Sequence, residues 1–96
     1  MTGAMRLMIL GTGAMARRHA EEFSPLPGCR IVAAADTNAE RARAFAEAHG
    51  IPFAFGSLSD ALAWGEFDAA VNVTPDGAHK ATTLELLAAG KHVFCE

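Results

Sequence analysis

The stretch Leu7-Met8-Ile9-Leu10-Gly11-Thr12-Gly13-Ala14-Met15-Ala16 decides the fold of this chain. Its four apolar residues predict a buried strand, and the glycines that follow predict a tight turn that opens a helix. In such a turn Gly11 allows the sharp bend, Gly13 lets the backbone approach a pyrophosphate, and the small Ala16 lets the helix pack close to the strand. Free N–H groups and a positive dipole end at the helix N-terminus favour phosphate binding.

Strand and helix patterns alternate along the whole chain. Strands are predicted over 6–10, 30–35, 53–55, 69–73 and 92–95, and helices over 15–23, between 37 and 50, over 57–64 and over 78–89. The nearly continuous apolar runs at 30–35 and 69–73 are typical of strands buried on both faces of a parallel sheet. Short connections and right-handed crossovers then predict the α/β class, with a doubly wound parallel sheet in three α/β/α layers and strand order 3-2-1-4-5.

Capping and packing patterns mark the predicted helices. Thr37 and Glu40 have the spacing of a capping box, and Gly50 follows the last turn of the same helix as a C-cap. Ser57 and Asp60 form a second, weaker capping pair. Helical spacing predicts that the second helix buries Ala42, Phe45, Ala46 and His49. The same spacing predicts that the last helix buries Ala81, Leu84, Leu87 and Ala88.

Composition narrows the classes of function. The chain has 96 residues, 51% of them apolar, and a net charge of −3, which suits one small domain with a packed core. It has no basic run, which argues against a nucleic-acid partner, and its apolar runs are too short to span a membrane. Two separate cysteines and four scattered histidines predict neither a disulfide framework nor a metal site. A cytoplasmic location is the expectation.

The predicted topology brings three segments to one edge of the sheet. Ligands of such sheets bind beyond the carboxyl ends of the strands, where the strand order reverses, here between the first and fourth strands. The segments that follow these strand ends are 11–16, 36–38 and 74–79. We therefore expect the functional residues in these segments.

Asp36 ends the second strand, 20 residues beyond Ala16. A carboxylate there can accept hydrogen bonds from both hydroxyls of an adenosine ribose and would repel a 2′-phosphate, which favours NAD over NADP. Asp36 as a cap of the following helix is the alternative. Arg41 and Arg43 lie one helical turn further on and could help to bind a phosphate, so NADP stays an alternative cofactor.

The segment from Thr74 to His79 is predicted to lie at the nicotinamide end of the same site. Thr74 offers a hydroxyl, Pro75 sets the direction of the chain, and His79 falls in the first turn of a helix. His79 could reach the cofactor or a substrate hydroxyl, or it could be an ordinary exposed histidine at a helix N-terminus. Spacing alone leaves both interpretations of His79 open.

These motifs resemble the Gfo/Idh/MocA oxidoreductases, a family named after glucose–fructose oxidoreductase and inositol dehydrogenase. The resemblance covers the whole chain. It is carried by 11–16 with Arg18-His19, by Asp36 with Glu40-Arg41-Ala42, by Val73-Thr74-Pro75 with His79, and by the run from Leu87 to Glu96. The resemblance implies a Rossmann-like dinucleotide-binding domain over residues 1–96. It also implies a parent NAD(P)-dependent oxidoreductase that transfers hydride between the nicotinamide and a sugar, cyclitol or related polyol.

The family pattern places Glu96 at the nicotinamide-side ribose and continues with a lysine, a proline and a substrate domain. The chain stops at Glu96, so we expect a domain that is truncated after its fifth strand and has no dehydrogenase activity by itself. We assign no catalytic and no metal-binding residue. A fifth strand without an outer neighbour favours a homo-oligomer. The candidate cofactor-binding residues are Gly11, Thr12, Gly13, Ala14, Met15, Asp36, Thr74, Pro75, His79 and Glu96. The alternative to an oxidoreductase is a non-catalytic NAD-sensing or interaction module. The alternative to NAD as the ligand is S-adenosylmethionine.

Overall fold

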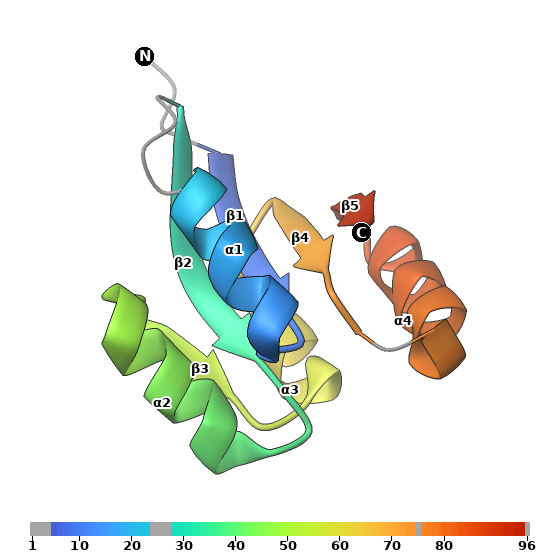
Figure 1. Cartoon of the computed structure of the whole chain (residues 1–96). Helices are drawn as coiled ribbons and strands as arrows, with labels where there is room; N and C mark the ends of the chain where they lie inside the picture. Colours follow the sequence, from blue (N-terminus) through green and yellow to red (C-terminus); the bar gives the residue numbers. More distant parts are fainter. Residues whose placement is uncertain (1–4, 24–27, 75, 96) are drawn as a thin grey trace.

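Five parallel strands form a single sheet in the computed structural model of the chain, which describes residues 5–23, 28–74 and 76–95 (Figure 1). The strands are β1 (Met5–Leu10), β2 (Cys29–Ala35), β3 (Phe53–Phe55), β4 (Ala69–Asn72) and β5 (His92–Cys95). Their order in the sheet, β3-β2-β1-β4-β5, confirms the predicted doubly wound topology. The helices between them are α1 (Ala14–Phe23), α2 (Ala39–His49), α3 (Leu58–Trp64) and α4 (Asp76–Ala88).

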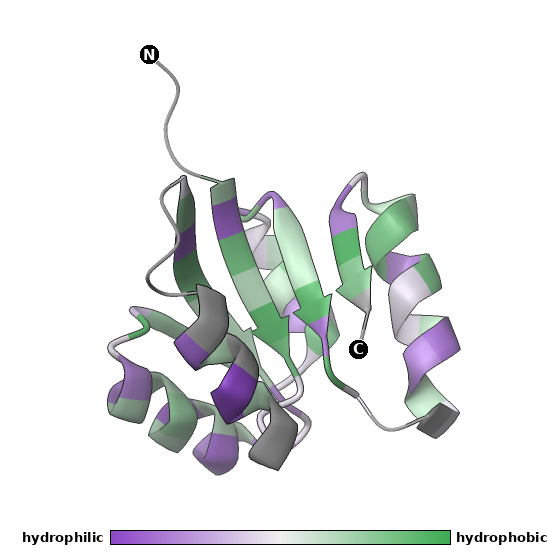
Figure 2. Cartoon of the chain, turned by 45° about the horizontal axis from the view of Figure 1, so that its top comes forward, coloured by the Kyte–Doolittle hydropathy of each residue, from purple (hydrophilic) through white to green (hydrophobic). Residues whose placement is uncertain are grey.

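Two apolar clusters cover the two faces of the sheet, because successive side chains of a strand point to opposite faces. Met8 and Leu10 of β1 pack in a cluster with Ala61 of α3 and Leu86 of α4. Ile9, which lies between them, belongs to the other cluster, which contains residues of α1 and α2. In Figure 2 the central strands are largely green, whereas purple and pale green segments alternate along α2, as expected for a helix with one face on the sheet.

The strand register aligns the carboxyl ends of the three central strands. Leu10 of β1 pairs with Ala35 of β2 on one side and with Asn72 of β4 on the other. The N–H of Gly11 then donates to the Ala35 carbonyl at 2.8 Å, and the N–H of Val73 donates to the Leu10 carbonyl at 2.8 Å. The segments that follow β1, β2 and β4 therefore leave the sheet side by side at one edge.

Two expectations about the helices are wrong in detail. The N-cap of α2 is Asn38 and not Thr37, because the Asn38 side chain accepts a hydrogen bond from the Arg41 N–H at 3.1 Å. The turn after β4 is also shorter than expected, since α4 already begins at Asp76. The Ser57 cap of α3 is confirmed by its 3.1 Å hydrogen bond from the Asp60 N–H.

The predicted buried face of α4 is wrong. Leu84 and Leu87 are 56% and 54% exposed, and Ala81 and Ala88 are exposed too, whereas Leu86 is fully buried. The inward face is set by hydrogen bonds from the Asn72 side-chain amide to the hydroxyls of Thr82 and Thr83, at 2.9 Å each. These bonds turn the threonines towards β4 and the two leucines away from it.

Among the described helices, none has the length and apolar character needed to cross a membrane.

Neighbouring leucines of α4 test this packing. Leu86→Ala should lower the free energy of unfolding by about 2–5 kcal/mol, because it opens a cavity beside Met8 and Phe67 in the core. Leu87→Ala makes the same chemical change on the exposed face and should change stability by about 0.5 kcal/mol or less. Urea denaturation of both variants measures the difference, and equal losses would contradict the observed orientation of α4.

Candidate functional site

A cavity of about 390 Å³ lies at the carboxyl ends of β1, β2 and β4. This is the edge where the strand order reverses, and the volume falls in the range of about 300–1,000 Å³ that is usual for small-molecule sites. The residues that line it come from all three strand ends and from α2, α3 and α4: Leu10, Gly11, Thr12, Gly13, Asp36, Thr37, Arg41, Leu58, Val73, Thr74, Ala78 and Thr82.

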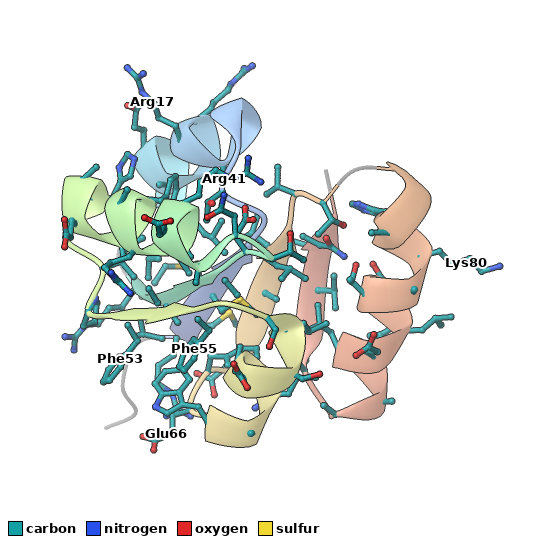
Figure 3. The ribbon with its side chains drawn as sticks, turned by 90° about the horizontal axis from the view of Figure 1, so that it is seen from below. Arg17, Arg41, Phe53, Phe55, Glu66 and Lys80 are labelled. Carbon is teal, nitrogen blue, oxygen red and sulfur yellow. The ribbon has the colours of Figure 1, made fainter. Side chains whose placement is uncertain are left out.

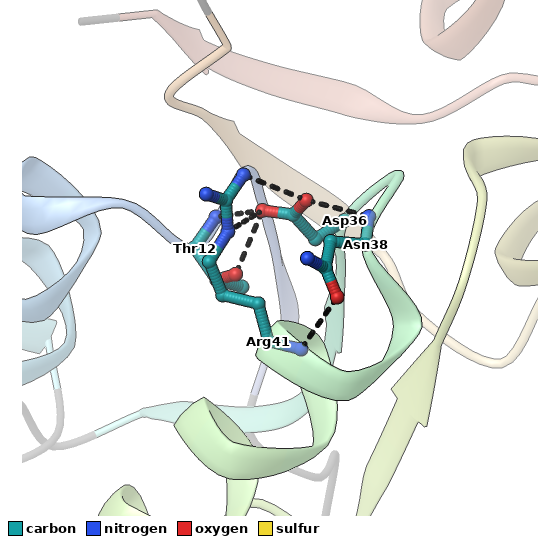
Figure 4. A network of polar contacts seen from close by, with 4 residues as sticks. All are labelled: Thr12, Asp36, Asn38 and Arg41. Carbon is teal, nitrogen blue, oxygen red and sulfur yellow. Dashed lines mark hydrogen bonds and ion pairs between the residues drawn. The ribbon is translucent and has the colours of Figure 1, made fainter.

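The Asp36 carboxylate is the centre of a hydrogen-bond network at this cavity (Figure 4). Its Oδ2 accepts from the backbone N–H and the hydroxyl of Thr12 at 2.8 and 2.7 Å. Its Oδ1 accepts from the backbone N–H of Asn38 at 2.9 Å. The Arg41 guanidinium donates to both oxygens, from Nε to Oδ2 at 3.2 Å and from Nη2 to Oδ1 at 3.0 Å.

This network keeps Asp36 ionised. Burial by itself would raise the pKa of the Asp36 carboxyl, but the hydrogen bonds from Arg41, Asn38 and Thr12 outweigh it and hold the pKa far below its usual value. The side chain of Asp36 is only 4% exposed, whereas that of Arg41 is 56% exposed. The site therefore contains a buried negative charge with a solvent-exposed positive partner.

The two glycines of the loop after β1 differ in what they require. Gly11 has φ +93°, and a Cβ there would lie 3.0 Å from the Val73 carbonyl oxygen, so its side must stay empty for β1 and β4 to meet. A Cβ on Gly13 would meet nothing within 4 Å, although Gly13 lines the cavity. The packing of the chain does not explain why residue 13 lacks a side chain.

A second polar network joins β4 to α4 at the far side of the cavity. The fully buried Asn72 accepts hydrogen bonds from the backbone N–H and the hydroxyl of Thr74, at 3.2 and 2.7 Å. Its amide donates to Thr82, whose hydroxyl lies 3.3 Å from that of Thr74. This network positions the two hydroxyl side chains that line this wall of the cavity.

The structure brings five of the predicted site residues to one cavity: Gly11, Thr12, Gly13, Asp36 and Thr74. Ala14 and Met15 are the first residues of α1. His79 is half-buried, with its ring Nδ1 3.3 Å from the Thr74 carbonyl oxygen, and it is not among the described residues that line the cavity. Pro75 and Glu96 lie outside the described residues.

Other residues of the site were missed or underestimated by sequence reasoning. Thr82 was overlooked because the wrong face of α4 was expected to be buried. Its signal is the helical spacing of His79, Thr82, Thr83 and Leu86. Asn72 was overlooked because it lies in an apolar strand. A single amide between two valines is the sequence signal that indicates a polar network there.

The arginines near the site differ in direction. Figure 3 shows Arg41 pointing inward, whereas Arg17, which pairs with Glu21 at 3.5 Å, points outward.

The Asp36 network should make folding stability depend on pH. The carboxyl has a pKa of about 3.9 when unfolded and a lower one when folded, so its contribution is fully present above about pH 5 and is lost as the pH falls through the folded value. The stability difference between the wild type and Asp36→Asn should stay constant from about pH 5 to 7 and shrink by about 1 kcal/mol at pH 3. Urea denaturation at each pH measures it, and a difference that does not change with pH would contradict this view of Asp36.

Comparison with known proteins identifies the chain. The model of a family described as an oxidoreductase family with an NAD-binding Rossmann fold, Gfo/Idh/MocA, matches residues 5–96. A curated relative, the 4-carboxy-2-hydroxymuconate-6-semialdehyde dehydrogenase of Sphingobium sp., is 33% identical over 92 residues. That alignment covers 96% of this chain and 29% of the relative.

Solved structures agree in fold. The WlbA dehydrogenase from Bordetella pertussis, in complex with NADH and UDP-GlcNAcA, has a TM-score of 0.90 and 34% identity over 96% of this chain and 29% of its own. The myo-inositol dehydrogenase from Lactobacillus casei, in complex with NAD(H) and myo-inositol, has a TM-score of 0.88 and 30% identity over 96% of this chain and 28% of its own. This chain thus spans less than a third of the length of these proteins, and it belongs, as an NAD-binding Rossmann portion, to the Gfo/Idh/MocA oxidoreductase family.

Proposed function

We propose that the cavity binds the adenosine and pyrophosphate part of NAD. We further propose that the complete protein is an oxidoreductase that transfers hydride between the nicotinamide and a sugar, cyclitol or related polyol. The observation that carries the proposal is the pairing, in one cavity, of an ionised carboxylate at the end of β2 with the open backbone at Gly13. Dinucleotide sites of this fold use these two features for the ribose and the pyrophosphate.

The residues at the cavity fit this cofactor. Gly13 leaves room where a side chain would stand between the backbone and a pyrophosphate, and α1 begins at the next residue, so its positive dipole end lies at the same place. Asp36 presents a charged acceptor for ribose hydroxyls. When bound, the nicotinamide supplies the hydride chemistry, while these residues bind and orient the dinucleotide.

The nicotinamide end of the proposed site lies beyond β4. Thr74 and Thr82 line the cavity there and offer hydroxyls to a ligand. His79 contacts the Thr74 carbonyl and would act at this end by holding the turn that carries Thr74. Roles for Pro75 and Glu96 remain predictions from the family resemblance, and no catalytic acid or base is assigned.

The substrate class rests on the relatives. One solved neighbour is in complex with myo-inositol and another with the sugar nucleotide UDP-GlcNAcA, both of which carry several hydroxyl groups. We therefore propose a polyhydroxylated substrate. We also propose that residues 1–96 are the dinucleotide-binding domain and that a further part of the complete protein builds most of the substrate pocket. A non-catalytic NAD-sensing module would bind the same cofactor but would turn over no polyol in the complete protein.

Gly13→Ala separates cofactor binding from folding. The added methyl group meets nothing within 4 Å apart from its own chain neighbours, so the melting temperature should stay the same or rise slightly. The methyl group would stand between the loop and the pyrophosphate, and NAD affinity should fall about tenfold or more, which corresponds to about 1.4 kcal/mol. Isothermal titration calorimetry with NAD measures the affinity.

Two results would contradict the proposal. The first is a wild-type chain that does not bind NAD, and the second is an unchanged affinity in Gly13→Ala. Gly11→Ala is unsuitable as a test, because its Cβ would press against the backbone of Val73 and disturb the fold itself.

A further inference from the structure

The side-chain amide of Asn72 has its orientation fixed by its neighbours. The backbone N–H of Thr74 can only donate, and it lies 3.2 Å from Oδ1, so this atom of the amide must be the oxygen. The amide nitrogen then faces α4, where it donates to the hydroxyl oxygens of Thr82 and Thr83 at 2.9 Å each. Because Asn72 is fully buried, these partners and not bulk water satisfy its amide.

The amide in turn determines how the two hydroxyl groups on this wall of the cavity are oriented. The Thr74 hydroxyl donates its proton to Asn72 Oδ1 at 2.7 Å. The Thr82 hydroxyl accepts from Asn72 and donates its own proton to the Ala78 carbonyl at 2.8 Å, one helical turn earlier. A hydroxyl has one proton and two lone pairs, so both protons are engaged within the described network. The lone pairs that remain make this wall a hydrogen-bond acceptor.

The distance between the two hydroxyl oxygens strengthens this acceptor character. The oxygens of Thr74 and Thr82 lie 3.3 Å apart. Two oxygens this close repel each other unless a proton lies between them. An N–H group of a ligand supplies such a proton and can be shared by both oxygens, whereas a ligand carbonyl would meet lone pairs only. The wall therefore distinguishes an amino group from a carbonyl or a methyl group in the same place.

The surroundings of the hydroxyl pair suit a flat ring. The side chains of Leu10, Leu58, Val73 and Ala78 line the same cavity and offer apolar contact. Ligand pockets typically combine such apolar walls with a small number of placed polar groups, which fix the orientation of the ligand. An aromatic ring that carries an amino group matches both features, because its faces are apolar and its N–H group is a donor.

We propose that Thr82, together with Thr74, recognises an amino group on a ring of the bound dinucleotide, and that Asn72 is the positioning residue that holds both hydroxyls as acceptors. The inference rests on the proposed function. NAD has two groups of this chemistry, the exocyclic amino group of adenine and the carboxamide amino group of nicotinamide. Either group can place an N–H between the two threonine oxygens.

Two analogues of NAD separate these two sources. Nicotinamide hypoxanthine dinucleotide has a carbonyl in place of the adenine amino group, and acetylpyridine adenine dinucleotide has a methyl group in place of the carboxamide amino group. The analogue that lacks the recognised group should bind the wild type about tenfold more weakly than NAD, because its hydrogen bond is lost and the threonine oxygens stay unpaired. Isothermal titration calorimetry with each dinucleotide measures the affinities.

Thr82→Val and Thr83→Val are a matched pair of variants. Each replaces a half-buried threonine by a residue of the same shape and removes a 2.9 Å hydrogen bond from Asn72, but Thr83 is not among the described residues that line the cavity. Thr82→Val should bind NAD about tenfold more weakly and should no longer prefer NAD to the affected analogue. Thr83→Val should keep the wild-type preference, and so should Thr82→Ser, which retains the hydroxyl.

The ratio of the affinities for NAD and the analogue is the readout that a purely structural role would not change. A wild type that binds NAD and both analogues equally, a ratio retained in Thr82→Val, or a ratio lost equally in Thr83→Val overturns the inference and leaves the proposed function intact. A wild type that does not bind NAD overturns both. Thr74→Val removes the other oxygen of the pair and takes the place of Thr82→Val if that variant does not fold.

Nuclear magnetic resonance tests the orientation of Asn72 without any variant. In the ¹⁵N-labelled chain, the Nδ2 protons of Asn72 should exchange slowly with water and give nuclear Overhauser effects to the side chains of Thr82 and Thr83. Saturation with NAD should preserve these effects, since the amide holds the wall in both states. Effects to the Thr74 N–H in place of those to α4 would put the amide nitrogen on the other side and overturn the inference.

Discussion

One buried negative charge organises the functional edge of this molecule. An ionised carboxylate taken out of water is costly unless several donors satisfy it. Asp36 meets this condition with donors from the loop after β1, from the turn that opens α2 and from the first turn of α2 itself. The loop and the helix are therefore held by the same group, and both line the cavity.

The sheet determines where this charge lies. Parallel pairing of β1 with both β2 and β4 brings three chain segments out at one edge, and the empty side of Gly11 lets the first of them pass within contact of the Val73 backbone. The strand order reverses between β1 and β4, and crossovers of one hand then place α1 and α2 on one face of the sheet and α3 and α4 on the other. The cavity lies at this reversal because no crossover helix covers that edge.

The features that sequence could predict are those that depend on local chemistry. The glycines after Leu10 and the apolar runs around Ala34 and Val71 were enough for the strands, their order and the edge that carries the site. The α2 cap was misjudged because Thr37 and Asn38 are both good caps, and the choice between them depends on the turn that Asp36 stabilises through the Asn38 N–H. The Arg41 contact needs two side chains to meet in space, which spacing along the chain does not specify.

The face of α4 shows the same limit. Leucine spacing suggested one buried stripe, but the amide of Asn72 binds the threonines on another side of the helix. A buried polar group must find partners, and this requirement outweighed the burial of two leucines. Tertiary hydrogen bonding thus decided an orientation that apolar periodicity left ambiguous.

The anchoring of Thr12 has a consequence for the speed of ligand entry. The N–H and the hydroxyl of Thr12 both donate to Asp36, so the glycine loop is tied to the end of β2. An exposed side chain such as that of Arg41 reorients in picoseconds to nanoseconds, whereas loops rearrange over nanoseconds to microseconds. We therefore expect ligand entry to be limited by the encounter with the ligand and not by a loop movement.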